Sequence, residues 1–265
     1  MVAALEPGRK KTEGVVSQFA GVYREWLPSP ALREHVRCFW RNDVRQSSAG
    51  FMHVVPDGCV DIVWTGDGLC VAGPDTRPIR EPVPQRVAFA GVRFHPGAAL
   101  PWLGLPLCEI VNRRVPLSEF WPDDAERFRE QASAATNGMA SAMEALLLAR
   151  LARVGQADRQ IAFLRKAAGD RLARARIGAG EIAACVGVSE RTMRRRCMEA
   201  FGYGFKTLDR VLRFQRFFRL AGCGEGCSLA VLAASAGYAD QAHLTREVQR
   251  MSGLTAGEFV SQIAA

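Results

Sequence analysis

The sequence predicts a two-domain α+β protein. Its N-terminal part is expected to be a small antiparallel β sandwich or barrel with flanking helices, and its C-terminal part all-α. From Phe19 to Trp121 the apolar segments are short and are separated by Gly and Pro, as in strands joined by turns. From Glu181 to Gly202 and again from Ser228 to Gly253, a short apolar helix, a turn with Gly and a polar or basic helix follow one another. This repeated pattern predicts tandem helix-turn-helix motifs.

The charge of the chain is concentrated in the predicted helical part. The 265 residues carry a formal net charge of +8 and are long enough for two domains with a buried core. Residues 1–154 hold 18 Lys and Arg against 17 Asp and Glu, whereas residues 155–265 hold 17 against 10. This asymmetry favours a polyanionic partner for the C-terminal part.

Cysteine usage and hydropathy indicate the compartment. Eight scattered Cys and no recognisable signal peptide are typical of a reducing cytosol, so we expect a cytoplasmic protein without a disulfide framework. No run approaches the roughly 18 apolar residues of a membrane span, so no membrane partner is expected.

The N-terminal elements follow in order. Residues 1–18 are polar and predict a disordered tail, and residues 19–121 predict a β-rich sensor or regulatory domain. Leu32–Trp40 fits a strand or a helical turn. The turn at 66–68 predicts a hairpin between the alternating segment 59–64 and the segment that begins at Leu69. The remaining strands are predicted at 51–55 and 87–94, and a short helix is predicted at 98–104.

Residues 122–168 form a predicted helical connector. Phe128, Met143, Leu147 and Leu151 recur at helical spacing, with a loop at 136–138. Two interpretations have equal weight: a packing or dimerisation surface between domains, or helices that cover the β core.

The first motif presents basic residues on its second helix. Met193, Cys197 and Phe201 share one buried stripe, and Ser189 is a good N-cap. The arginines that face outward could bond to guanine edges or pair with phosphates. A solvated basic face is the alternative interpretation. These arginines are Arg191, Arg194 and Arg195.

The second motif has a similar stripe, Leu244, Val248 and Met251. Its exposed side is expected to carry fewer residues that can read bases, so this half is interpreted as the weaker partner. Between the motifs, Phe205–Leu220 predicts a linker helix about 24 Å long, which could hold two reading helices near the roughly 34 Å spacing of successive major grooves. The candidate residues of the second motif are Gln241, Ala242, His243 and Arg246.

The region from Gly180 to Val260 resembles the DNA-binding domain of the AraC/XylS family of bacterial transcription regulators. The resemblance rests on VSERTMRRRCMEAFGYG and on GYADQAHLTREVQRMSGLTAGEF. It implies a DNA-binding domain over 169–265 that reads double-stranded promoter DNA, with RNA polymerase as a further partner. The family's base-contacting positions fall on the seven candidate residues named above. Two departures are Cys197, where the family usually has a bulky aromatic residue, and Ala256, where it usually has Pro.

The N-terminal part resembles a sensor-type domain that accompanies some of these regulators, through VPDGCVDIVW, VAGPDTRP and GVRFHPGAA. Polar residues on or beside its strands predict a candidate pocket for a small effector. We expect no cofactor or metal, since close pairs such as C-x-x-C are missing. These candidate pocket residues are His53, Cys59, Asp61, Trp64, Arg93 and His95.

The alternative to a regulator is a DNA-targeted enzyme, or a thiol or metal sensor, that uses the N-terminal domain. A Cys59/His95 pair would be the nucleophile and base, although no spacing supports it. Cys223 and Cys227 could form a redox pair or be two exposed loop thiols. The preferred interpretation is a sequence-specific regulator without catalytic residues. The sequence leaves open the effector, the target genes, activation or repression, and a homodimer.

Overall fold

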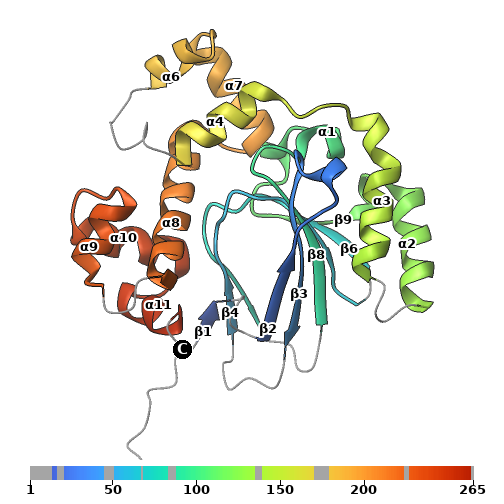
Figure 1. Cartoon of the computed structure of the whole chain (residues 1–265), viewed down its shortest axis with the longest axis horizontal. Helices are drawn as coiled ribbons and strands as arrows, with labels where there is room; N and C mark the ends of the chain where they lie inside the picture. Colours follow the sequence, from blue (N-terminus) through green and yellow to red (C-terminus); the bar gives the residue numbers. More distant parts are fainter. Residues whose placement is uncertain are drawn as a thin grey trace, which may run out of the picture.

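The chain folds into a β region and a group of helices that pack side by side (Figure 1). The computed structural model describes residues 14–16, 21–44, 51–66, 68–82, 88–134, 139–169, 179–223 and 227–263. An α+β architecture with an N-terminal β region and a helical C-terminal region was predicted, and it is confirmed.

The strands of the described residues form two sheets. The larger sheet has six strands in the order β2-β3-β8-β5-β6-β9, with antiparallel neighbours throughout. The smaller sheet has the order β1-β4-β7. The bounds are β1 Gly14–Val16, β2 Gly21–Trp26, β3 Val36–Val44, β4 Phe51–Val54, β5 Asp61–Trp64, β6 Leu69–Ala72, β7 Ile79–Pro82, β8 Ala88–Phe94 and β9 Arg114–Pro116.

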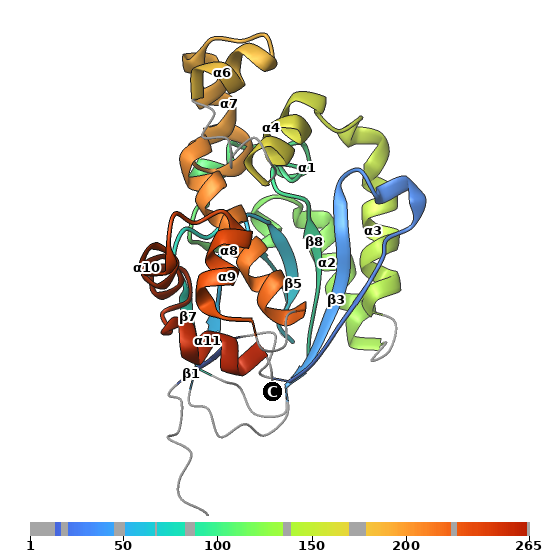
Figure 2. The same cartoon turned by 60° about the vertical axis from the view of Figure 1, so that its left-hand side comes forward.

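The two faces of the larger sheet differ because side chains alternate along a strand. On one face Phe39, Ile62 and Val92 belong to an apolar core that also takes in Phe128 of α2 and Leu147 of α3. Helices α2 (Pro122–Ala134) and α3 (Met139–Val154) therefore cover this face (Figure 2). The opposite face carries polar residues and lines the pocket described below.

Several local predictions are confirmed. β5 and β6 pair as an antiparallel hairpin from Asp61↔Ala72 to Trp64↔Leu69. The short helix is α1, Leu100–Leu103. Both interpretations of 32–40 apply, because a 3₁₀ turn, η2 (Pro30–Leu32), leads into β3. Further 3₁₀ turns are η3 (Leu107–Glu109) and η4 (Leu117–Glu119).

The prediction of a disordered tail over 1–18 is wrong for Gly14–Val16. These residues form β1, which pairs in parallel with β4. Val16 is buried, and its N–H donates to Gln262 Oε1 of α11 at 2.9 Å. Apolar burial and backbone pairing at a site distant in sequence offset the entropy of ordering this short segment.

The predicted helical connector is divided between two cores. Met143 and Leu147 place α3 in the core of the β region, as one of the two interpretations proposed. Helix α4 (Arg159–Gly169) packs against α8 instead, with Ile161 and Leu164 buried in the core of the C-terminal helices. The predicted loop at 136–138 lies outside the described residues.

The C-terminal helices form a second core around the linker helix, α8. The linker is longer than predicted: it runs over 19 residues, Phe205–Cys223, which corresponds to about 28 Å. Phe214 and Phe217 of α8 pack on Phe259 at ring distances of 5.4 and 5.9 Å. None of the described helices combines the length and apolar character needed to cross a membrane. The other helices are α6 Ala179–Cys185, α7 Glu190–Phe201, α9 Leu229–Ala236, α10 Gln241–Ser252 and α11 Ala256–Ile263.

Candidate nucleic-acid interface and effector pocket

Helix α7 presents the predicted arginines to solvent. Ser189 caps the helix, since Thr192 N–H donates to Ser189 Oγ at 3.2 Å. The stripe formed by Met193, Cys197 and Phe201 is buried as predicted, so the opposite face must point outward. Arg191, Arg194 and Arg195 are exposed.

These arginines are available to a ligand. Arg195 has a loose ion pair with Glu199, at 3.7 Å, with 69% of the Arg195 side chain exposed. Such a surface pair contributes at most about 1 kcal/mol and can be exchanged for a phosphate or a base. Within the described residues Arg191 and Arg194 have no ion-pair partner.

Helix α10, like α7, has a side-chain N-cap and a buried apolar stripe. Asp240 caps it by accepting a hydrogen bond from His243 N–H at 2.6 Å. The His243 ring meets Tyr238 edge-on at 5.3 Å, so this residue is half-buried rather than free on the surface. Gln241, Ala242 and Arg246 are exposed. Together α7 and α10 are called the reading helices below.

The two departures noted in the sequence are accommodated locally. Cys197 is fully buried, and burial raises the pKa of its thiol to about 11, so it behaves as a small apolar residue. The second departure, Ala256, is the first residue of α11, and a capping box stabilises the start of this helix. Thr255 N–H donates to Glu258 Oε2 at 2.9 Å and Glu258 N–H donates to Thr255 Oγ1 at 3.3 Å.

Helix α8 connects the two helix-turn-helix motifs and contacts both of them. Arg210 of α8 pairs with Glu247 of α10 at 3.3 Å, and the guanidinium of Arg213 lies 5.6 Å from the Tyr238 ring centroid. Val211 and Phe214 are buried together with the stripes of both reading helices. Because one helix contributes to both contacts, the two reading helices are held in a defined relation.

Both reading helices end against the β region. The glycines that terminate them, Gly202 (φ +83) and Gly253 (φ +74), are left-handed. A Cβ at Gly202 would lie 2.6 Å from Val111 Cγ2 and 3.1 Å from Leu107 O, and one at Gly253 would lie 3.0 Å from His53 Nδ1. The orientation of each reading helix therefore depends on contacts with the N-terminal region.

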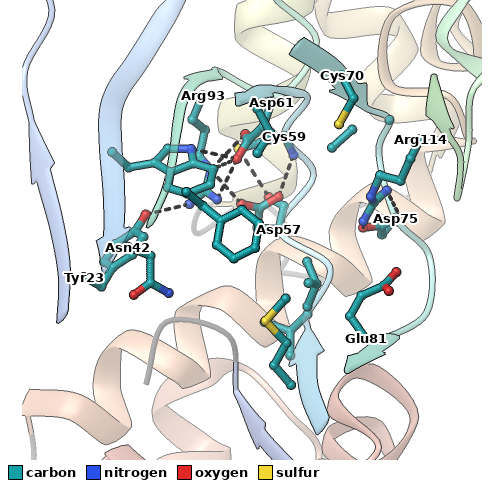
Figure 3. Close-up of a pocket in the computed structure, with 18 of the residues that line it drawn as sticks. Tyr23, Asn42, Asp57, Cys59, Asp61, Cys70, Asp75, Glu81, Arg93 and Arg114 are labelled. Carbon is teal, nitrogen blue, oxygen red and sulfur yellow. Dashed lines mark hydrogen bonds and ion pairs between the residues drawn. The ribbon is translucent and has the colours of Figure 1, made fainter. Parts of the chain in front are cut away.

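A cavity of about 570 Å³ lies between the polar face of the larger sheet, the smaller sheet and α8 (Figure 3). Its size is within the roughly 300–1,000 Å³ of small-molecule sites. Asp61 and Arg93 line it from the larger sheet, Met52 and Glu81 from the smaller sheet, and Gln215 from α8.

An ion cluster occupies one end of the cavity. Arg93 donates to Asp61 from Nε at 3.0 Å and from Nη2 at 2.8 Å, and it lies 3.3 Å from Asp57. Trp40 Nε1–H donates to Asp61 Oδ2 at 3.0 Å. Burial disfavours the charged forms: it raises the pKa of Asp61, while the nearby carboxylates keep the pKa of Arg93 well above its usual value.

The structure brings three of the six candidate pocket residues together. Cys59, Asp61 and Arg93 line the cavity, as the alternation along the strands indicated. His53, Trp64 and His95 are outside its lining. His53 faces the end of α10, since its ring is beside Gly253. Trp64 packs on Phe128 at 5.7 Å and His95 bonds to the Arg33 carbonyl, so these are corrections to the predicted set.

Other lining residues were not predicted. Trp40 and Asn42 alternate along β3 and could have been found from that periodicity. Arg114 of β9 and Glu81 of β7 come from strands whose partners are distant in sequence, and Asp75 comes from the loop between β6 and β7. For Gln215, which comes from α8, no local signal exists.

The predicted alternative of cysteine chemistry has no geometric support. Burial raises the pKa of Cys59 well above its usual value, which disfavours the thiolate that a nucleophile requires. The ring of His95 is occupied by the Arg33 carbonyl at 3.2 Å. In the described part of the chain no three His, Cys, Asp or Glu residues are placed to hold a metal ion.

The turn between β4 and β5 joins the cavity to the helices. Asp57 and Cys59 line the cavity. Beside them, Gln215 Nε2–H of α8 donates to the Pro56 carbonyl at 2.8 Å. A Cβ at Gly58 would lie 3.5 Å from the hydroxyl of Tyr203, which follows α7. The same turn thus contacts the cavity, α8 and the end of the first reading helix.

Comparisons with known proteins match both regions. Residues 182–262 match a family model described as a helix-turn-helix domain, and residues 24–116 match a domain of unknown function (DUF6597). The comparison with curated proteins found no match.

Among solved structures, the chain is similar to ToxT from Vibrio cholerae O395, with 9% identity and a TM-score of 0.46 over 86% of this chain and 98% of that one. It is also similar to the C-terminal domain of AraT, a response regulator from Geobacillus stearothermophilus, with 14% identity and a TM-score of 0.36 over 39% of this chain and 85% of that one.

The tandem helix-turn-helix motifs and the matched family model define the class. The C-terminal region is a helix-turn-helix domain, and the N-terminal region matches a domain of unknown function. A helix-turn-helix domain is a DNA-binding fold, so the C-terminal region is the DNA-binding part of the chain.

Proposed function

We propose that the chain is an effector-responsive regulator whose two reading helices enter two successive major grooves on one face of promoter DNA. On α7 the base and phosphate contacts fall to Arg191, Arg194 and Arg195. On α10 they fall to Gln241, Ala242, His243 and Arg246. The support is their position opposite two buried stripes, on helices anchored to one rigid linker.

The response to an effector is supported by the turn between β4 and β5. A ligand that displaces Asp57 would move a turn held by Gln215 of α8 and in contact with Tyr203. Tyr203 is buried, so a shift of the turn must be accommodated by the end of α7. Occupancy of the cavity would then alter the relation between the two reading helices and the affinity for DNA.

The remaining partners follow from this class of protein. The proposed targets are promoter sites, with RNA polymerase as the machinery that the bound regulator influences, and a homodimer is one arrangement on DNA. All eight cysteines are free thiols, which agrees with the proposed cytoplasmic setting.

The test is Arg195→Ala, compared with Arg153→Ala, which removes an exposed arginine of α3. Bound duplexes are selected from a random library, sequenced and used in titrations at fixed salt. If Arg195 reads a base, its loss costs about 1–3 kcal/mol and relaxes preference at one base pair. Arg153→Ala should leave affinity unchanged. Uniform weakening without altered preference would make Arg195 a phosphate contact, and no selected sequence at all would contradict the proposed reading function.

A further inference from the structure

The charges that line the cavity are unbalanced at one end. At the first end, the carboxylates of Asp57 and Asp61 are matched by Arg93, and Arg37 adds a second guanidinium that interacts with Asp57. At the other end, Arg114 is the lining guanidinium beside Asp75 and Glu81, and Arg77 also interacts with Asp75 from outside the lining. The whole lining holds four carboxylates and three guanidinium groups.

The Arg114 guanidinium is already paired with Asp75. It donates to both oxygens of Asp75, from Nη1 at 3.1 Å and from Nη2 at 2.7 Å, which is bidentate pairing. Only 8% of the Asp75 side chain is exposed. Glu81 forms neither a hydrogen bond nor an ion pair with the residues that the structure describes. In Figure 3 its side chain extends from β7 toward the Asp75–Arg114 pair. Glu81 is therefore a half-buried carboxylate that no described side chain pairs at this end of the cavity.

An aromatic surface lies elsewhere in the same cavity. The Trp40 ring lies directly against Gly91, where a Cβ would come within 2.7 Å of two ring atoms. Tyr23 stacks on Trp40 with ring centroids 6.0 Å apart and planes at 28°. Phe89 and Met52 also line the cavity. This surface suits a flat apolar group.

We propose that the cavity binds a small organic ammonium ion, with its charged nitrogen at Glu81 beside Asp75 and a flat apolar body on the Tyr23–Trp40 surface. The proposal rests on the proposed function, because it names the ligand class of the same effector pocket. An anionic ligand is disfavoured at this end, since it would have to approach Asp75 and Glu81 while the Arg114 guanidinium is already paired with Asp75.

The test uses three probes that share one ring and chain: phenethylamine, 2-phenylethanol and 3-phenylpropionate. Their binding to the full chain is measured by calorimetry at neutral pH. The amine should bind roughly ten-fold more tightly than the alcohol or the acid. Glu81→Gln should remove most of that preference. Glu119→Gln, which changes an exposed carboxylate of η4, should leave it intact.

Three outcomes overturn the ligand class: tighter binding of the acid, an amine preference that survives Glu81→Gln, or no binding of the amine at millimolar concentration. Titration of selected DNA in the same samples separates this inference from the proposed function. If the amine binds but DNA affinity is unchanged, the ligand site stands and effector response fails. If DNA is bound specifically and the amine is not bound, the ligand class fails and the reading function stands.

Discussion

Substitution of Gly202 tests the claim that the β region holds the first reading helix. The change is Gly202→Ala at the left-handed residue after α7. The matched control is Gly187→Ala, also left-handed (φ +69), where no described atom lies within 4 Å of the added Cβ. The two variants share the backbone strain and differ in whether the new methyl meets the N-terminal region.

The magnitude follows from these surroundings. Left-handed backbone costs a non-Gly residue about 1–2 kcal/mol at either position. At Gly202 the methyl would also lie 2.6 Å from Val111 Cγ2 and 2.9 Å from Pro74 Cγ. Overpacking of this kind costs about 1–3 kcal/mol more. We therefore expect a loss of about 2–5 kcal/mol in the free energy of unfolding for Gly202→Ala, and about 1–2 kcal/mol for the control.

The assay is urea unfolding followed by tryptophan fluorescence, together with DNA titration of the folded fraction. Weaker DNA binding is expected for Gly202→Ala, because α7 must tilt to relieve the clash. Equal destabilisation of the two variants, with unchanged DNA binding in both, would refute the reasoning that α7 is positioned by the N-terminal region.

Three other predictions concern stability. Asp61→Asn should lower the free energy of unfolding by about 3 kcal/mol in urea titrations, because Arg93 loses its main buried partner; a loss below about 1 kcal/mol would contradict this role. Burial, together with the charge of Arg165, lowers the pKa of His95 from 6.5 to about 4. As pH falls, the unfolded chain therefore binds a proton at His95 before the folded chain does. The free energy of unfolding then decreases between about pH 6.5 and about pH 4. His95→Gln should remove that part of the pH dependence, and an unaltered pH profile would argue against it. Thr255→Ala should cost about 1 kcal/mol by opening the capping box, and an unchanged thermal midpoint would show that the cap contributes nothing.

The local features of this fold were predictable because they depend on neighbours in sequence. The stripe of Met193, Cys197 and Phe201 requires only helical periodicity, and the cap at Ser189 requires only its own turn. The β5–β6 hairpin similarly depends on the turn between two short segments, where Thr65 N–H donates to Gly68 O. The exposure of Arg191 and Arg194 follows from the buried stripe.

Pairing between distant segments was not predictable from such patterns. β4 leads through a short turn to β5, yet it joins β1 and β7 in a separate sheet. Trp64 and His95 belong to residue types that occur in ligand sites, but one packs on Phe128 and the other bonds to the Arg33 carbonyl. Strand partners and packing faces are chosen by the free energy of the whole fold, which local propensity does not contain.

The sequence by itself determined the class of this protein, because two helix-turn-helix motifs and their basic faces are encoded within short spans. Only the tertiary structure decided which parts of the N-terminal region those motifs contact. The cavity needs both sheets and Gln215 of α8, and the contacts at Gly202 and Gly253 join residues far apart in the chain. Contacts of this kind arise when two cores pack against each other, so the relation between the pocket and the reading helices is a property of the assembled fold.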